Sequence, residues 1–257
     1  MRRLITALAL IVVAAYLIGW APYLVFAGAA VLMGLLCYRE YAGLVAAHNI
    51  PRSGLLGLLA GVSIVFWPHE ALAIASVLFV CAFVAALRFH SLRDVLPSVA
   101  CEFLGSVYTF AAWRFAIDLR AESKHLLFFA LALNWIGDSA AYYAGRAFGK
   151  HRMAPVVSPK KTWEGAAASI LASLVFGIIY LHYSEYGKWW QAAILAVIGN
   201  VAGQLGDLAE SAIKRGGRVK DSGSFLPGHG GMLDRVDSSL FTLPVIYLLN
   251  KILLSAT

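Results

Sequence analysis

Residues 4–38 read LITALALIVVAAYLIGWAPYLVFAGAAVLMGLLCY and contain no charged side chain. A helix crosses the hydrocarbon core of a bilayer with about 20 residues, so this run is too long for a single span. Gly19 and Pro22 lie near its middle, where they favour a break. Arg2 and Arg3 precede the run as in a secretory signal, but no small-residue cleavage site follows. We therefore expect two helices that stay in the membrane.

The rest of the sequence repeats this apolar character. Further apolar runs cover residues 53–67, 71–87, 97–113, 125–145, 165–183, 189–206 and 239–254. The composition is 60% hydrophobic and 14% charged, whereas soluble proteins have about 25% charged residues, so a water-soluble globule is excluded. We expect an all-α, polytopic integral membrane protein with about nine transmembrane helices.

We expect this protein to be one integral membrane domain over residues 1–257, because no internal repeat or soluble appendage is evident. Its N-terminal helices would occupy 1–120 and its catalytic helices 125–254, with a polar signature loop at 211–237. If the N-terminus is inside, 16 Lys and Arg fall on that side and 5 on the other. This asymmetry follows the positive-inside rule and predicts an active-site cavity facing the cytosol, at the inner membrane if the source is bacterial.

The polar segment 211–237 reads SAIKRGGRVKDSGSFLPGHGGMLDRVD. Glycines such as Gly230 and Gly231 let backbone amides approach a ligand, and successive amides form an anion cradle. Basic side chains in the segment suit phosphate oxygens, and these are Lys214, Arg215, Lys220 and Arg235. A solvated loop would explain the polarity but not the glycines around alternating charges. The segment therefore predicts a polyphosphate ligand.

Three acids of the same segment, Asp221, Asp234 and Asp237, need a cation between themselves and a phosphate because like charges repel. Carboxylate oxygens suit Mg²⁺, which proteins commonly hold with one or two carboxylates plus substrate phosphates and water. Salt bridges, for example from Asp234 to Arg235, are the alternative, but exposed pairs contribute little to stability. We expect Mg²⁺, or Mn²⁺ in its place.

Two further acids, Asp138 and Asp207, lie inside apolar runs. A charge at the centre of a membrane costs about 2.5 to 3.5 kcal/mol on insertion scales, so each acid needs a partner. We expect Asp207 to share the metal ion with the downstream aspartates, with pairing to Lys214 or Arg215 as the alternative. We expect Asp138 to line a polar cavity, with hydrogen bonding to neighbouring helices as the alternative.

The segment 151–165, HRMAPVVSPKKTWEG, places Ser158, Lys160 and Lys161 just before an apolar run. A basic patch on anionic headgroups would explain the lysines, at about 1 kcal/mol per cation. Their position in a tight Ser-Pro turn favours phosphate binding instead. His229 stands between glycines, where an imidazole can bind phosphate, orient a carboxylate or shuttle a proton, and the sequence leaves these roles open.

The segment 211–237 resembles the signature of the phosphatidate cytidylyltransferase, or CDP-diacylglycerol synthase, family. The residues that match its spacing are Ser211, Ile213, Lys214, Arg215, Lys220, Asp221, Gly223, Leu226, Pro227, His229, Gly230, Gly231, Asp234, Arg235 and Asp237. GDSAAYYAGRAFGKH (137–151) and SPKKTWEG (158–165) also resemble segments of that family. The resemblance covers about residues 130–240.

This resemblance implies an enzyme of phospholipid biosynthesis that condenses CTP with phosphatidic acid to give CDP-diacylglycerol and pyrophosphate. It implies that Asp207 and Asp234 hold the divalent ion, with Asp237, Asp221 and Asp138 as further ligands and K⁺ as an additional ion. Catalytic roles then fall on Asp207, Asp234, Lys220, His229 and Arg235, and substrate binding on Ser158, Lys160, Lys161, Lys214, Arg215, Gly230 and Gly231. Phosphate nucleophiles are already ionised, so His229 is expected to position groups rather than remove a proton.

Two other functions fit part of the pattern. A CTP-dependent lipid kinase of the dolichol kinase type would transfer the γ-phosphoryl group to an alcohol instead. A cation transporter would also place Asp138 and Asp207 inside helices, but it would not need a glycine-rich loop dense in Lys, Arg and His. The expected partners are CTP, phosphatidic acid and membrane lipid, with no nucleic acid, and the family resemblance adds a homodimer.

Overall fold

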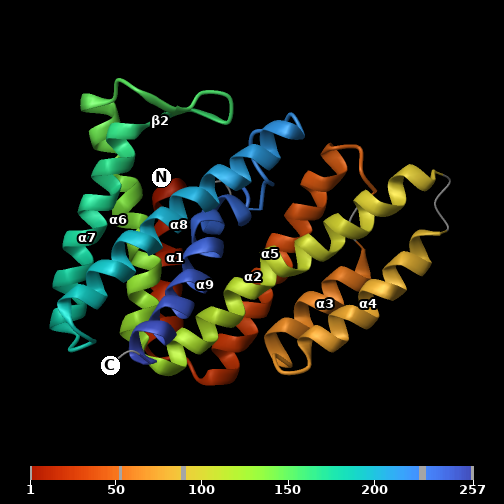
Figure 1. Cartoon of the computed structure of the whole chain (residues 1–257), viewed down its shortest axis with the longest axis horizontal. Coiled ribbons are helices and arrows are strands. Elements are labelled where there is room, and N and C mark those ends of the chain that lie inside the picture. Colours follow the sequence, from red (N-terminus) through yellow and green to blue (C-terminus); the bar gives the residue numbers. More distant parts are fainter. Residues whose placement is uncertain (1, 52–53, 88–90, 226–229, 256–257) are drawn as a thin grey trace. The chain divides into compact units, whose positions relative to one another are not determined.

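The computed structural model describes residues 2–51, 54–87, 91–225 and 230–255, and the side chains of residues 11–253 within those ranges. Its helices are α1 (Arg2–Gly19), α2 (Tyr23–Ala47), α3 (Leu55–Phe66), α4 (Ala71–Ala86), a short 3₁₀ helix η1 (Leu92–Asp94), α5 (Val95–Glu122), α6 (Lys124–Phe148), α7 (Trp163–Tyr183), α8 (Trp189–Gly216) and α9 (Leu233–Ser255). Two strands, β1 (Arg152–Ala154) and β2 (Ser158–Thr162), complete it (Figure 1). The predicted all-α class is confirmed, since each expected apolar run forms a helix.

Five of the described helical segments are long and apolar enough to cross a membrane. They are Tyr23–Ala47, Leu92–Glu122, Trp163–Tyr183, Trp189–Gly216 and Leu233–Leu253. The apolar helices α3 and α4 have 12 and 16 residues, fewer than the about 20 that a span requires. The chain is therefore an integral membrane protein, while a total of nine spans stays a prediction.

Two boundaries differ from the sequence prediction. Helix α8 continues to Gly216, and α9 begins at Leu233 rather than near 239, so both ends of the segment 211–237 are helical. The segment 151–165 forms an antiparallel hairpin in which Arg152 faces Thr162 and Ala154 faces Ser158. Polar composition indicated loops in both places. The start of α9 is held by Glu40, which is distant in the sequence, and the hairpin is held by pairing between its own strands.

The chain divides into two compact units. Unit 1 consists of residues Met1–Ile117 and Ile213–Val236, and unit 2 of Asp118–Ala212 and Asp237–Thr257. Helices α5, α8 and α9 contribute residues to both units. The expectation of one integral membrane domain stays a prediction.

Close helix packing in unit 1 depends on glycines that face an aromatic ring. A side chain at Gly34 of α2 or Gly61 of α3 would overlap the ring of Phe110 on α5. Phe110 itself is fully buried. Small residues of this kind let helices approach closely in membranes, where van der Waals packing replaces the hydrophobic effect between helices.

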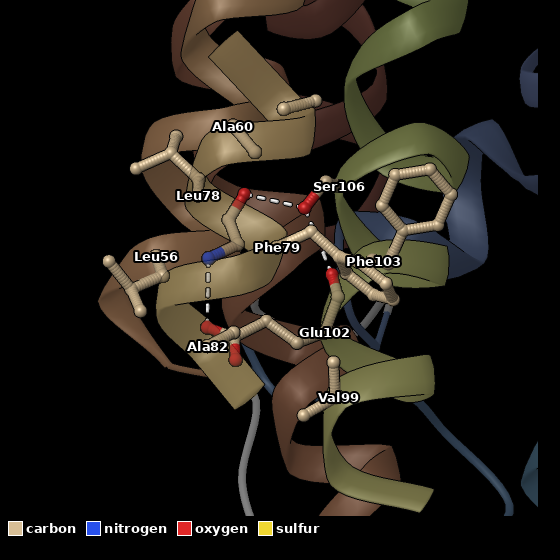
Figure 2. Close-up of a pocket in the computed structure, with 11 residues that line it drawn as sticks. Leu56, Ala60, Leu78, Phe79, Ala82, Val99, Glu102, Phe103 and Ser106 are labelled. Atoms are coloured by element: carbon tan, nitrogen blue, oxygen red, sulfur yellow. Dashed lines mark hydrogen bonds between the residues drawn. The ribbon is translucent and has the colours of Figure 1, made fainter. Parts of the chain in front are cut away.

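Helix α3 of unit 1 begins at a carboxylate supplied by α5. Oε1 of Glu102 accepts hydrogen bonds from the backbone amides of Gly54 and Gly57, at 2.9 and 2.8 Å. Figure 2 shows Glu102 and Ser106 at the polar side of a small apolar pocket that α3, α4 and α5 line. Glu102 thus satisfies amides that would otherwise lack partners at a helix N-terminus.

Helices α6 and α7 of unit 2 pack along their length (Figure 1), and buried polar groups connect them with α8 and α9. Asn134 of α6 donates to Ser239 at 3.2 Å and accepts from Thr242 at 2.9 Å. Asn200 of α8 donates to Ser169 and Ser173 of α7, at 2.9 and 2.8 Å. Polar groups in lipid require such internal partners, and this network fixes the helices that carry Asp138 and Asp207.

Candidate active site

Lys161 and Asp207 form an ion pair in unit 2. The N-cap residue Thr162 accepts a hydrogen bond from the amide of Gly165 at 3.2 Å, which places Lys161 directly before α7. Nζ of Lys161 lies 2.7 Å from Oδ2 of Asp207 on α8. Ser211, one turn further along α8, donates to the other carboxylate oxygen at 3.3 Å. The hairpin thus supplies a cation to an acid that the sequence assigned to a metal ion or to Lys214 or Arg215.

Asp138 of α6 belongs to the same charged cluster. It interacts electrostatically with both Asp207 and Lys161. Two carboxylates from different helices therefore share the field of one ammonium group. Two carboxylates facing one ammonium group attract a further cation. The cluster therefore brings together the two acids that the sequence placed inside apolar runs.

The hairpin that carries Lys161 is closed by a side-chain contact between its two ends. Nδ1 of His151 lies 2.6 Å from Oε1 of Glu164 in the first turn of α7. The amide of Trp163 donates to the carbonyl of His151 at 3.0 Å. Lys160 is exposed on β2, and Ser158 is half-buried at the start of that strand. The sequence analysis did not single out His151, so its role in closing the hairpin was missed.

Asp234 lies near the start of α9 in unit 1 and is surrounded by donors. Nζ of Lys214 lies 2.6 Å from its Oδ1, and the two side chains are only 11% and 7% exposed. The amides of Ser222 and Gly231 donate to its Oδ2 at 3.0 and 2.8 Å. Asp234 therefore connects the end of α8, the following loop and the start of α9.

A second carboxylate, from Glu40 of α2, holds the same part of unit 1. Its Oε1 accepts from the amide of Met232 at 3.0 Å, and its Oε2 accepts from the amide of Leu233 at 2.8 Å. The hydroxyl of Ser222 also donates to Oε2 at 3.1 Å. The sequence prediction missed Glu40, although an acid near the end of an apolar helix is a functional-site signal by default.

The glycines of the segment are needed where these carboxylates approach the backbone. Gly230 has a φ of +81°, and a Cβ there would lie 2.9 Å from Oδ2 of Asp234. A Cβ at Gly223 would lie 2.6 Å from Oε1 of Glu40, and one at Gly231 would overlap Glu40 and Ser222. The predicted role of Gly230 and Gly231 as an anion cradle stays a prediction, since in this structure the amide of Gly231 donates to Asp234.

The remaining site residues lie in both units. The side chains of Arg215, Lys220, Asp221 and Arg235 are exposed in unit 1. Asp237 belongs to unit 2, where its backbone carbonyl packs against Gly206, the residue before Asp207. His229, Leu226, Pro227 and Gly228 lie outside the described residues.

The carboxylates of unit 2 fit the donor chemistry of Mg²⁺. Asp138 and Asp207 provide hard oxygen ligands, and the ammonium of Lys161 already occupies a cation position against Asp207. Among the described residues, no group of three or more His, Cys, Asp or Glu side chains is assembled for a metal ion. A site of this kind would hold Mg²⁺ with few protein ligands, and substrate phosphates and water would complete its coordination.

Apolar helices that carry clustered carboxylates and ammonium groups define an integral membrane protein with a charged cluster in each unit. Residues 1–253 match the model of the cytidylyltransferase family. The match extends over nearly all of the sequence, including every helix that bears a site residue. The chain belongs to this family.

Relatives with a named activity resemble the chain along most of its length. The phosphatidate cytidylyltransferase of Staphylococcus aureus is 31% identical over 257 residues, which covers 96% of this chain and 97% of the relative. The protein of the same name from Staphylococcus saprophyticus is 32% identical, over 85% of this chain and 86% of the relative. That from Staphylococcus haemolyticus is 41% identical over a shorter match, 60% of this chain and 57% of the relative.

Proposed function

We propose that this protein is an integral membrane phosphatidate cytidylyltransferase, which converts CTP and phosphatidic acid to CDP-diacylglycerol and pyrophosphate in phospholipid biosynthesis. The observation that carries this proposal is the near full-length similarity to proteins named for that activity. The charged clusters of the two units support it, because each combines a cation suited to phosphate with an acid on an apolar helix.

The reaction joins two phosphates. An oxygen of the phosphatidate phosphate attacks the α-phosphorus of CTP, a new phosphorus–oxygen bond forms, and the bond from the α-phosphorus to the bridging oxygen breaks so that pyrophosphate leaves. The attacking oxygen is already ionised, so the protein needs no strong base. Its contribution is to align the two substrates and to balance their negative charge.

We assign charge balance to the basic side chains of both units. Lys160 and Ser158 on β2 and Lys161 beside Asp207 would contact phosphate oxygens from unit 2. Lys214, Arg215, Lys220 and Arg235, together with Gly230 and Gly231, would do so from unit 1. His229 stays a proposed positioning residue.

We further propose that the reaction depends on Mg²⁺, or Mn²⁺ in its place, with K⁺ as an additional ion. When bound, the divalent ion would withdraw charge from the phosphates of CTP. Asp138 and Asp207 fit this role through their clustering in unit 2. The family signature adds Asp234, Asp237 and Asp221, although the carboxylate of Asp234 already accepts hydrogen bonds from Lys214, Ser222 and Gly231.

The arrangement in the membrane is also proposed from the sequence. The excess of basic residues in alternate segments supports an active site facing the cytosol, in the inner membrane of a bacterium. Helices α3 and α4 would complete nine spans with partial crossings or with local thinning of the bilayer, because each is short for a full span. A homodimer rests on the family resemblance alone.

Product analysis with labelled CTP tests the activity. Purified protein is incubated with phosphatidic acid, a lipid alcohol, a divalent ion and CTP labelled either in cytidine or at the γ-phosphate. Cytidine label in the lipid fraction is the expected result. Lipid that carries only γ-phosphate would identify a kinase and overturn the proposal. Ion flux in liposomes that proceeds without CTP and survives loss of Lys220 and His229, with no labelled lipid, would identify a transporter.

A further inference from the structure

Glu40 stands apart from the signature segment in the sequence but is bound to it in the structure. Its carboxylate accepts the amides of Met232 and Leu233, the latter 193 residues away along the chain, and the hydroxyl of Ser222. One side chain of α2 thus joins the loop after α8 to the first residues of α9. Both ends of the loop would be less constrained without it.

Ser222 connects Glu40 to Asp234. Its hydroxyl donates to Glu40 at 3.1 Å, while its amide donates to Asp234 at 3.0 Å. Asp234 in turn lies 2.6 Å from the ammonium of Lys214. A continuous set of contacts therefore leads from Glu40, which is outside the signature, to two residues inside it.

Hydrogen bonds from backbone amides to a carboxylate determine which other amides are left to face a ligand. The amides at the N-terminus of a helix attract anions, and Glu40 takes those of Met232 and Leu233 at the start of α9. Both of its carboxylate oxygens already accept hydrogen bonds. Glu40 therefore acts on the backbone of the segment, and its contacts do not resemble those of a metal ligand.

We propose that Glu40 is a positioning residue of the cytidylyltransferase reaction, which holds the described residues 214–225 and 230–235 in the conformation that presents their cations to CTP. The proposal rests on the proposed function. Glu40 acts through Ser222 and the start of α9, so its loss displaces Lys214 and Asp234 without removing either. Misplacement of catalytic groups by about 1 Å reduces turnover about 100-fold.

Glu102 provides a matched control within unit 1. It also lies on an apolar helix, and it also accepts two backbone amides at the start of another helix, those of Gly54 and Gly57 of α3. Figure 2 shows its carboxylate among apolar side chains of α3, α4 and α5, with none of the predicted site residues among them. Glu40→Ala and Glu102→Ala therefore remove equivalent caps, and only the first cap belongs to the signature segment.

The experiment compares the parent protein with Glu40→Ala, Glu40→Gln and Glu102→Ala. Glutamine keeps the shape of Glu40 but turns an N–H group toward a donor at Met232, Leu233 or Ser222. Steady-state formation of CDP-lipid gives kcat and the KM for CTP, thermal unfolding gives stability, and hydrogen exchange reports the amides of residues 232–233 and 54–57. Glu40→Gln also serves as the test if Glu40→Ala fails to fold.

We expect both Glu40 variants to lower kcat/KM for CTP by about 10- to 100-fold and to speed exchange at residues 232–233. Glu102→Ala is expected to speed hydrogen exchange at residues 54–57 and to lose about as much stability as the Glu40 variants. Its kcat/KM should stay within about twofold of the parent value. Ser222→Ala, which removes the hydroxyl bond to Glu40 and keeps the amide bond to Asp234, should lower kcat/KM in the same direction. In the double variant with Glu40→Ala, the loss of kcat/KM should be smaller than the product of the two single losses.

Any of three results would overturn the positioning role. The first is parental kinetics in both Glu40 variants, and the second is an equal loss of activity in Glu102→Ala. The third is unchanged hydrogen exchange at residues 232–233, which would show that the carboxylate does not hold α9. A parent protein that forms no CDP-lipid would instead contradict the proposed function, and the exchange data would still report whether Glu40 orders the segment.

Discussion

The ammonium of Lys214 lies 2.6 Å from a carboxylate oxygen of Asp234, and both side chains are almost completely buried. The sequence assigned both residues to ligand binding, yet in this structure each is the partner of the other. The pair joins the end of α8 to the start of α9 within unit 1. Loss of one partner leaves the other charge without its main compensation, which is costly in a buried site.

Lys214→Met is therefore expected to lower the free energy of unfolding by about 3 kcal/mol. Lys220→Met is the control, because Lys220 lies in the same segment and is exposed, so its loss should change stability by no more than about 0.5 kcal/mol. Unfolding in mild detergent, followed by circular dichroism, measures both. Equal stability of the two variants would show that the Lys214–Asp234 pair does not stabilise the segment.

Asp207→Asn is expected to reduce turnover at least about 100-fold, because it removes charge from the cluster with Asp138 and Lys161. The ion pair of Lys161 and Asp207 is about a third exposed, with side-chain exposures of 27% and 30%, so the fold should persist. Assays of CDP-lipid formation and gel filtration give the two readouts. Near-parental turnover in a correctly folded variant would remove Asp207 from the site.

Lys161→Met tests whether the same cluster acts as a unit. Each single substitution should lower kcat/KM, and the double variant with Asp207→Asn should lose less than the product of the two effects. Lys160→Met is the comparison, because it removes an exposed cation from the same strand as Lys161. Strict additivity of Lys161→Met and Asp207→Asn would indicate that the two side chains act independently.

Gly230→Ala is expected to destabilise the protein by about 1 to 3 kcal/mol, because the residue has a φ of +81° and a Cβ would lie 2.9 Å from Asp234. Gly43→Ala provides the contrast, since Gly43 lies in α2 with open space around it. An alanine in a helix interior should be neutral or stabilising by up to about 1 kcal/mol. A thermal shift of equal sign and size for both variants would contradict this account of Gly230.

The sequence predicted the helices well because apolar runs are local signals. The break between α1 and α2 lies at Gly19 to Pro22, where the sequence placed it. The start of α9 at Leu233 was missed because its amides are satisfied by Glu40, and a contact between residues 193 positions apart leaves no local pattern. The polar residues at the start of α9 were therefore predicted to belong to a loop.

The candidate site was predictable in its residue types but not in its pairings. Acids in apolar runs and a cation-rich glycine segment are visible in the sequence, and they pointed to Asp138, Asp207 and Lys214. That Lys161 pairs with Asp207, and Lys214 with Asp234, depends on a hairpin and a loop whose conformations arise from tertiary contacts. Pairing with Arg215 or Arg235 was equally compatible with sequence spacing.

Dependence on a divalent ion is a separate prediction. Activity should disappear in excess EDTA and return when Mg²⁺ or Mn²⁺ is restored, because the carboxylates and the phosphates of CTP repel each other without a cation. Unfolding temperatures with and without EDTA serve as the control for loss of folding. Full turnover in excess EDTA would contradict a metal-dependent mechanism.

The most direct measurement is the stoichiometry of products from purified protein in liposomes that contain phosphatidic acid, with CTP and Mg²⁺ outside and inside. The account predicts that pyrophosphate and a cytidine-bearing lipid form in equal amounts, and that neither forms with Asp207→Asn. Consumption of CTP without a cytidine-bearing lipid, or release of CDP in place of pyrophosphate, would contradict it.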